Sequence, residues 1–310
     1  MNIFVLFGQT ATGKTAKALE LASQHNGEIV NFDSRQIYKK LTLVTGKDIT
    51  PEMKFIEQKT VNRATIGYYQ DSTRIWLYDI VDPKEIFSSS EYSDAAFGVI
   101  ADILSRGKTP ILVGGTGYYL YHLLYGVPQI SVPENWPLRN ELKDKSVSEL
   151  TELLKAKNAA LFDGLNESDR MNPRRLIRRI EIAYAGGVLP ARPSEMTIIS
   201  RLNSLTSHPG GGHGPIGIQF MPFFHTESEK TREIIRARVM KRLEEGAVEE
   251  TQKLLGEGYT KTDPGLNAIG YQQIIAYIEN EMTKDQMIEL WITREIQYAK
   301  RQKTFFKKYF

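Results

Sequence analysis

The chain has 310 residues, with 40 lysines and arginines against 37 aspartates and glutamates, giving a formal net charge of +3. This length suggests about two domains, or one large domain with an insertion. The composition, 41% hydrophobic and 25% charged, excludes a mainly disordered chain, and no apolar run reaches the roughly 18 residues of a membrane-spanning helix. The sequence contains no cysteine, which excludes disulfides, thiolate zinc sites and cysteine nucleophiles and indicates a cytoplasmic location.

The first third of the chain alternates apolar strands with amphipathic helices. Strands are expected at residues 3–7, 28–32, 76–81 and 110–113, and helices at residues 14–24 and 91–105. Residues 66–69 could form an edge strand or a loop. This alternation predicts an α/β core with a parallel sheet and helices on both of its faces.

The pattern changes after Gly126. Prolines 128, 133 and 137 mark a linker, and residues 138–186 are helical and polar with no strand candidate. A glycine-rich loop at residues 209–215 precedes a strand at 216–224, and two or three long helices fill residues 227–310. We therefore expect a core made of residues 1–126 and 211–310, interrupted by an all-helical insertion domain at residues 127–210.

Residues 8–15, Gly-Gln-Thr-Ala-Thr-Gly-Lys-Thr, match the phosphate-loop pattern G-x-x-x-x-G-K-[ST] in full. The motif follows a predicted strand and precedes a predicted helix, as its function requires. Its backbone N–H groups and the helix N-terminus can bind phosphate oxygens, Lys14 adds a point charge, and the Thr15 hydroxyl can hold Mg²⁺. These features predict a P-loop NTPase-like core that binds a diphosphate or triphosphate.

The loop does not identify the reaction. Kinases and ATPases usually place an acidic residue at the end of a neighbouring strand to hold the metal, but the strand at 110–113 ends in glycines 114 and 115. An acid, Asp33, follows the second strand instead. It lies at the carboxyl end of a parallel strand, where ligands of an open α/β sheet bind. From the residues alone, Asp33 could be either a turn cap or a catalytic residue.

Five motifs occur in order along the chain: residues 8–15, Asp33-Ser34-Arg35-Gln36-Ile37-Tyr38, residues 112–119 (Leu-Val-Gly-Gly-Thr-Gly-Tyr-Tyr), residues 268–273 (Ala-Ile-Gly-Tyr-Gln-Gln) and residues 300–306 (Lys-Arg-Gln-Lys-Thr-Phe-Phe). Together they make the chain similar to the tRNA dimethylallyltransferase (tRNA isopentenyltransferase) family over its whole length. Some members carry a C-terminal Cys/His zinc finger. A chain without cysteine resembles the short bacterial-type form.

The resemblance implies transfer of a dimethylallyl group from dimethylallyl diphosphate to the exocyclic amine of the adenosine beside the anticodon. The diphosphate would lie in residues 8–15 (Gly8, Gln9, Thr10, Ala11, Thr12, Gly13, Lys14 and Thr15), with Mg²⁺ at Thr15. By the same resemblance, Asp33 accepts the proton of the amine, and Thr10 and Arg238 are further catalytic residues. Donors aimed at the charge that develops on diphosphate would supply much of the catalysis.

Two basic segments suggest RNA contacts. Arg170, Arg174, Arg175, Arg178 and Arg179 fall within ten residues, and Lys300, Arg301 and Lys303 lie on the C-terminal helix beside aromatic residues. The alternative for the first segment is a solvated helix neutralised at its ends by Asp169 and Glu181. The expected tRNA-binding residues, some of them carried over from the resemblance, are Asp33, Ser34, Arg35, Gln36, Thr116, Arg139, Arg174, Arg175, Arg178, Lys300, Arg301 and Lys303.

Three other functions compete with the transfer of a dimethylallyl group to tRNA. An adenylate isopentenyltransferase would act on free AMP, ADP or ATP with the same scaffold, but a free nucleotide needs no long basic track. A P-loop kinase or NTPase is opposed by the missing acid at Gly114, and a non-enzymatic RNA-binding module by the intact phosphate loop.

The five histidines (25, 122, 208, 213 and 225) show no metal-site spacing and are expected at the surface or in packing. A monomer that does not bind membranes is expected.

Overall fold

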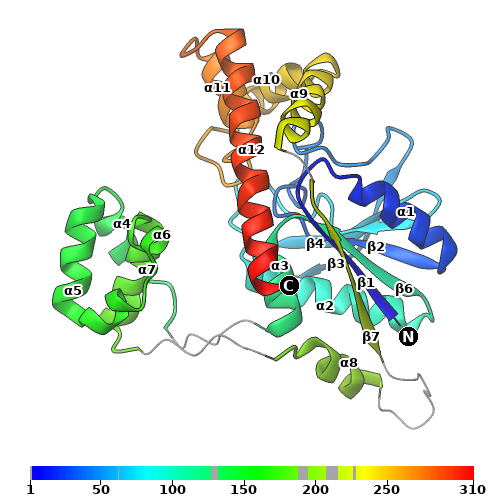
Figure 1. Ribbon diagram of the computed structural model, residues 1–310, viewed down its shortest axis with the longest axis horizontal. Coiled ribbons are helices and arrows are strands. Elements are labelled where there is room, and N and C mark those ends of the chain that lie inside the picture. The colour runs from blue at the N-terminus through cyan, green and yellow to red at the C-terminus, as the bar shows by residue number, and fades with distance from the viewer. Residues whose placement is uncertain (1, 62, 127–131, 188–194, 207–215, 226–227) are drawn as a thin grey trace. The chain divides into compact units, whose positions relative to one another are not determined.

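The computed structural model describes residues 2–61, 63–126, 132–187, 195–206, 216–225 and 228–310. The chain divides into two compact units, residues 1–126 with 195–310, and residues 127–194. The first unit contains β1 (Asn2–Gly8), α1 (Lys14–Gln24), β2 (Gly27–Asn31), β3 (Lys54–Val61), β4 (Ala64–Gln70), β5 (Arg74–Trp76), α2 (Ser89–Ser105), β6 (Thr109–Gly114), α3 (Gly117–Tyr125), α8 (Ile198–Thr206), β7 (Gly217–Phe223), α9 (Ser228–Glu244), α10 (Ala247–Gly256), α11 (Tyr271–Ile278) and α12 (Lys284–Tyr309) (Figure 1). The α/β class and the phosphate-loop core agree with the sequence.

Within the described residues, the strands form one seven-stranded sheet in the order β3-β4-β5-β2-β6-β1-β7. β5, β2, β6, β1 and β7 are parallel, but β3 and β4 form an antiparallel hairpin at one edge. The sheet is therefore mixed. The expected parallel arrangement is confirmed for these five strands, and residues 66–69, expected as an edge strand or a loop, form part of β4 in the antiparallel hairpin. β3 was missed because most of its side chains are exposed, so its sequence carries no apolar run.

The strand expected at residues 76–81 is also wrong. β5 ends at Trp76, and the backbone then adopts positive φ at Leu77 (68°) and Asp79 (55°), which a strand does not allow. The apolar side chains of this segment are nevertheless buried, since Leu77, Ile80 and Val81 are fully covered. The apolar run indicated burial correctly but not its backbone conformation.

The central strands are covered on both faces. Phe4 and Leu6 of β1 pack in a cluster with α1, whereas Ile3, Val5 and Phe7 pack in the larger cluster with α2, α3 and α12. Because successive side chains of a strand point to opposite faces, this division explains why β1 is apolar at nearly every position.

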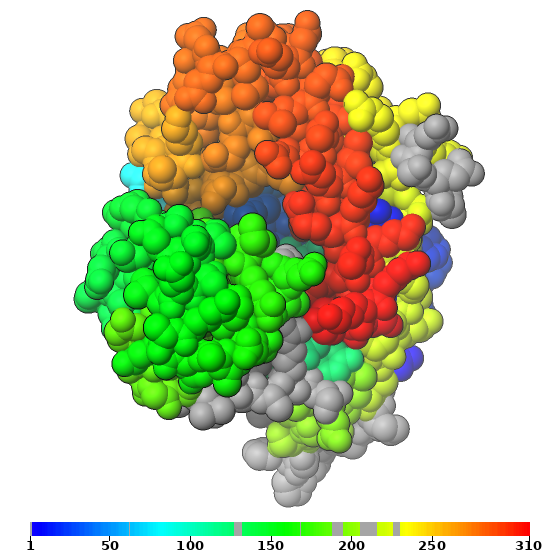
Figure 2. Space-filling view, turned by 60° about the vertical axis from the view of Figure 1, so that its left-hand side comes forward, coloured from blue at the N-terminus to red at the C-terminus, as the bar shows by residue number. Residues whose placement is uncertain are grey.

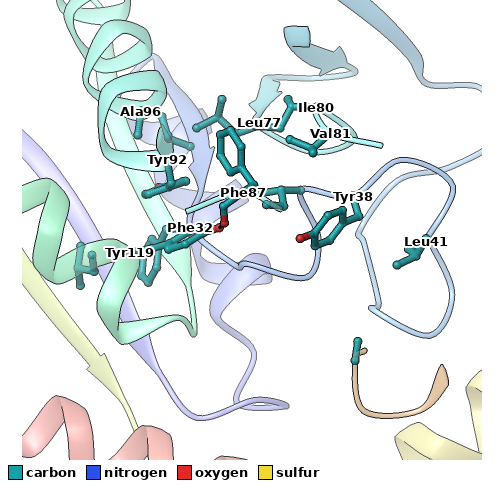
Figure 3. Packing of buried hydrophobic residues seen from close by; sticks show 14 of the residues in the cluster. Phe32, Tyr38, Leu41, Leu77, Ile80, Val81, Phe87, Tyr92, Ala96 and Tyr119 are labelled. Atoms are coloured by element: carbon teal, nitrogen blue, oxygen red, sulfur yellow. Dashed lines mark hydrogen bonds between the residues drawn. The ribbon is translucent and has the colours of Figure 1, made fainter. Parts of the chain in front are cut away.

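The end of β2 is fixed by a group of buried aromatic rings. Phe32, Tyr92 and Tyr119 lie together in the core behind this strand end (Figure 3). The rings of Tyr92 and Tyr119 are stacked with centroids 4.1 Å apart, and the Tyr92 hydroxyl donates to the Asn31 carbonyl at 3.1 Å. The backbone that leads into Asp33 is therefore held on a rigid support.

Helices α9, α10, α11 and α12 form the C-terminal part of the first unit, where two or three long helices were expected. α12 packs against α9 and α11, and also against β1 and α3. One long face of α12 lies open at the surface of this unit (red in Figure 2). The same helix therefore contacts the sheet core with one side and presents basic residues to solvent with the other.

The second unit is helical throughout its described part, with α4 (Trp136–Leu142), α5 (Val147–Asp163), α6 (Glu167–Arg170) and α7 (Pro173–Tyr184). They enclose a separate core that includes Leu150, Leu154, Leu176 and Ile180. This unit ends at residue 194 and not at 210. Ile198 and Leu202 of α8 pack in the main core, so residues 195–206 belong to the first unit.

The glycine-rich loop at residues 209–215 lies outside the described residues. No helix in the described part of the chain is long and apolar enough to cross a membrane.

Candidate active site

The phosphate loop joins β1 directly to α1. At Gly8 the loop passes so close to β7 that a Cβ atom would lie 1.9 Å from the Phe223 carbonyl oxygen, and φ is +142°. Only glycine fits this close approach. The next residue, Gln9, donates its backbone N–H to the same carbonyl at 2.9 Å. The start of the loop is therefore fixed against the edge of the sheet.

Lys14 lies inside the curve of the loop. Its ammonium group donates to the Gln9 carbonyl, and lies 3.4 Å from both the Gly8 carbonyl and the Thr12 hydroxyl. Burial lowers the pKa of Lys14 to about 8; the Asp33 carboxylate opposes this shift and the Arg238 guanidinium adds to it. The charge of Lys14 thus becomes sensitive to pH in the neutral to alkaline range.

Helix α12 holds the loop from outside. The Gln302 side chain accepts from the Thr10 N–H at 2.8 Å and donates to the Gly115 carbonyl at 3.0 Å. The Gln9 amide donates to the Ala299 carbonyl at 3.1 Å and accepts from the His225 N–H at 2.8 Å. Two amide side chains therefore join the phosphate loop, the end of β6 and the end of β7 to one helix.

His225 takes part in the same arrangement. Its ring Nε2 lies 3.0 Å from the Thr10 carbonyl, so the ring nitrogen donates to this oxygen. The sequence placed this histidine only at the surface or in packing. The usable signal was its position directly after β7, because the carboxyl ends of parallel strands meet at the ligand edge of the sheet.

Replacing Gln302 by leucine is expected to weaken pyrophosphate binding about tenfold and to destabilise the protein by about 1–3 kcal/mol. The Thr10 N–H loses its partner, and the Gly115 carbonyl keeps only the longer hydrogen bond from the Tyr298 hydroxyl at 3.4 Å. Isothermal titration with pyrophosphate and chemical denaturation measure these effects. Gln297 lies exposed on the same helix, so Gln297→Leu is the matched control and should change neither quantity. Equal behaviour of the two variants would contradict a positioning role for Gln302.

Asp33 begins a tight turn after β2. Its carboxylate Oδ1 accepts from the Arg35 N–H at 2.8 Å, so the turn-cap role is present. The turn is tied to the start of α3, because the Ser34 N–H donates to the Thr116 hydroxyl at 2.9 Å. The cap uses one carboxylate oxygen, and no hydrogen bond to Oδ2 is found in the part of the chain that the structure describes. Capping and chemistry are therefore compatible at Asp33.

A cavity of about 310 Å³ joins these parts. It brings together most of the predicted catalytic and phosphate-binding residues; its lining comprises Thr10, Ala11, Thr12, Gly13, Lys14, Thr15, Ala16, Asn31, Asp33, Gln36, Thr45, Gly46, Asp48, Tyr78, Val113, Gly114, Gly115, Arg238 and Gln302. The Arg238 Nη1 donates to the Thr10 hydroxyl at 2.6 Å, although 228 residues separate the two. Asp48, Tyr78 and Gln302 also line the cavity and were not predicted as site residues; Asp48 and Tyr78 lie outside the five motifs, and Gln302 lies in the motif at residues 300–306 without being assigned a role.

The donor groups fit a magnesium ion that is held partly by a phosphate ligand. Thr15 offers a hydroxyl to the cavity, and Asp33 and Asp48 add carboxylates to the same lining. Among the described residues, no group of three or more histidines or acids is arranged to hold a metal by itself. Mg²⁺ keeps several waters and commonly binds one or two protein groups together with substrate phosphates. Thr15 with diphosphate oxygens matches this pattern.

The arginines of the second unit are largely engaged in ion pairs. The Arg139 guanidinium donates to both oxygens of buried Glu181, at 2.7 and 3.0 Å, and Arg178 donates to the same carboxylate at 2.9 Å. Arg175 pairs with Asp169. Asp169 and Glu181 therefore neutralise two members of the predicted cluster, Arg175 and Arg178, as the alternative of a neutralised helix expects.

Other predicted RNA-binding residues differ in their exposure. Arg174, Lys300 and Arg301 are exposed, whereas Lys303 donates to the His225 carbonyl at 3.2 Å. Arg35 donates to the Pro264 carbonyl at 3.0 Å. The exposed cations can reach a phosphate backbone, while Lys303 and Arg35 also hold the fold.

Comparison with known proteins identifies the chain's relatives. The IPP transferase family model matches residues 36–309, and the isopentenyl transferase model matches residues 1–67. A tRNA dimethylallyltransferase of Endomicrobium trichonymphae is 35% identical over 99% of this chain and 92% of its own length. One from Acetivibrio thermocellus is 33% identical over 99% and 89%. This chain belongs to the IPP transferase family.

Solved structures of the IPP transferase family share the fold. A tRNA isopentenylpyrophosphate transferase of Staphylococcus epidermidis matches with a TM-score of 0.62 and 25% identity, covering 99% of this chain and 90% of that one. The structure of a eukaryotic dimethylallyltransferase acting on tRNA matches with a TM-score of 0.68 and 24% identity, covering 97% and 68%. The family membership and the transferase class expected from the sequence motifs are confirmed.

Proposed function

We propose that this chain transfers a dimethylallyl group from dimethylallyl diphosphate to the exocyclic amine of the adenosine adjacent to the anticodon in tRNA, releasing diphosphate. One observation carries the proposal: the phosphate loop, Arg238 and Asp33 line a single cavity. Family membership supports the same reaction, since the relatives bear the name tRNA dimethylallyltransferase. A cytoplasmic, monomeric enzyme is part of the proposal.

The reaction exchanges one bond for another. The bond between the allylic carbon and the diphosphate oxygen breaks, its electron pair stays on diphosphate, and the amine nitrogen bonds to the carbon. The nitrogen then carries a surplus proton, which passes to the Asp33 carboxylate. Both charges develop inside the cavity, where fixed groups of the opposite sign act with little screening.

The leaving group would lie in the phosphate loop. Backbone N–H groups at the start of α1, the Lys14 ammonium and the Arg238 guanidinium are placed to stabilise the negative charge that grows on it. The Thr15 hydroxyl would hold Mg²⁺, which supplies further positive charge to the diphosphate oxygens.

The acceptor adenine would enter from the side of the Asp33 turn. An adenine inside the stacked anticodon loop cannot reach a cavity of this kind, so the base has to leave its stack. Thr116 and Ser34 are hydrogen-bonded to each other at this edge, and they would fix the turn that receives the base.

Labelled dimethylallyl diphosphate, supplied with Mg²⁺ and either unmodified tRNA or AMP, tests the proposal directly. We expect label on tRNA and none on AMP. A tRNA with guanosine in place of the target adenosine is the control and should stay unlabelled. Label on AMP alone would replace the tRNA proposal by the adenylate alternative, and phosphate transfer from ATP would replace both.

The exposed Arg174 offers a sharper RNA test than its neighbours. Arg174→Ala should weaken tRNA binding and reduce the slope of log affinity against log salt by about one phosphate contact. Filter binding at several salt concentrations measures the slope, and thermal unfolding should be unchanged. Arg178→Ala is the comparison, because Arg178 also donates to the Val132 carbonyl at 2.7 Å and its loss should lower the stability of the second unit. An unaltered slope in Arg174→Ala would contradict an RNA contact on α7 and favour the alternative of a solvated helix.

A further inference from the structure

Arg242 is a buried arginine that lies beside the proposed diphosphate site without lining its cavity. It follows Arg238 by four residues on α9, so both side chains lie on the same face of the helix. Only 6% of Arg242 is exposed. A buried arginine normally requires a paired charge, and the partner here is Glu295 of α12, whose carboxylate lies 3.4 Å from Nη1 of Arg242.

Gly46 makes room for both guanidinium groups. A Cβ atom at this position would lie 2.3 Å from Nη2 of Arg242 and 2.6 Å from Nη2 of Arg238. Gly46 itself lines the cavity and has a φ of +66°, a conformation that glycine adopts without strain. The two arginines therefore approach the cavity wall from behind the same backbone position, and only Arg238 reaches through to the lining.

The two cations are not equally neutralised. Arg242 has Glu295, whereas Arg238 forms no ion pair within the described chain and donates to the uncharged Thr10 hydroxyl. The neighbouring charges of Arg238 and Arg242 repel each other, and after burial this repulsion is the next cause that lowers the pKa of Arg242, to about 10. Arg238 therefore keeps a charge that an anion in the cavity can use.

We infer that Arg242 is a positioning residue for diphosphate binding. It pairs with the Glu295 carboxylate and thereby leaves the guanidinium of Arg238 free for the ligand. Without Arg242, the Glu295 carboxylate would keep only the uncharged Trp291 indole N–H, at 3.4 Å, and would draw Arg238 away from Thr10. The inference rests on the proposed function, because it requires that diphosphate binds in the cavity lined by Arg238.

Titration with inorganic pyrophosphate at a fixed Mg²⁺ concentration tests the inference through binding alone. Arg242→Met should lower pyrophosphate affinity about tenfold or more, since one charge-assisted contact is lost. The double variant Arg242→Met with Glu295→Gln removes the competing carboxylate and should recover most of this affinity. Glu295→Gln alone leaves the charge of Arg242 unpaired beside the site and should bind pyrophosphate at least as tightly as the unaltered protein; weaker binding would contradict the inference.

The possible outcomes separate the two proposals. If the unaltered protein fails to bind pyrophosphate, both the proposed diphosphate site and the role of Arg242 are overturned. If it binds and Arg242→Met binds equally well, only the inference about Arg242 fails. If affinity is lost and Glu295→Gln does not restore it, Arg242 serves general stability and the inference is again wrong. Circular dichroism and thermal unfolding of each variant verify that the loss does not come from misfolding.

Discussion

Asp33→Asn is expected to lower the turnover number by about 100-fold or more while tRNA affinity changes little, because a positioned base typically contributes about 10²–10⁴-fold. Asparagine keeps an oxygen that can accept from the Arg35 N–H, so the turn cap at 2.8 Å should survive. The exchange therefore removes the proton acceptor and leaves the local structure in place. Single-turnover transfer to tRNA, with binding measured separately, gives the two quantities.

Asp48 provides the matched control. It is the other carboxylate found along the described lining of the cavity, and the proposed step gives it no proton. Asp48→Asn should retain turnover within a few-fold, because the proposal assigns Mg²⁺ to Thr15 and the diphosphate oxygens and not to Asp48. Near-normal turnover of Asp33→Asn would remove Asp33 from the mechanism, and equal losses in both variants would indicate a general electrostatic effect of the cavity.

Lys14→Met is expected to lower turnover by about 10²–10³-fold, the usual cost of removing one donor aimed at developing negative charge. The structure adds a dependence on pH. Burial lowers the pKa of Lys14 to about 8, so the ammonium loses its proton as the pH rises through this value. Diphosphate prefers the charged form, and pyrophosphate affinity should therefore be highest below pH 8 and fall above it.

Lys14→Arg separates this effect from the titration of pyrophosphate itself. Arginine stays protonated throughout the accessible range, so the difference between the two pH profiles isolates the lysine. Titrations between pH 7 and pH 9.5 should show a steeper loss of affinity in the unaltered protein than in Lys14→Arg. Parallel profiles would contradict a pKa of Lys14 near 8.

The phosphate loop could be predicted in detail because its function is encoded locally. The strand before it is buried on both faces, the loop follows a fixed glycine pattern, and the expected helix at residues 14–24 has the observed bounds of α1. The end of the sheet formed by β3 could not be predicted in the same way. Its side chains mostly face solvent, and pairing with β4 depends on backbone hydrogen bonds that leave no apolar pattern.

The contacts that form the walls of the cavity could not be predicted from the sequence either. Arg238 and Gln302 contact Thr10 across 228 and 292 residues of chain, and residue spacing does not reveal such contacts. The family resemblance supplied Arg238 but assigned Gln302 no role. Likewise, the sequence left two alternatives for the arginines of α7, an RNA contact or a helix neutralised by Asp169 and Glu181. Spacing does not reveal that Glu181 lies between Arg178 and the distant Arg139.

The packing of α12 has a consequence for the order in which the protein folds. Rings at its end, Phe306 and Phe310, lie 4.9 and 5.6 Å from the ring of Phe7 at the end of the first strand. Contacts between such distant segments require the closure of a very long loop and form late. During synthesis, the first strand and the phosphate loop therefore cannot complete their packing until residues 306–310 have left the ribosome, and the catalytic centre can assemble only after that point.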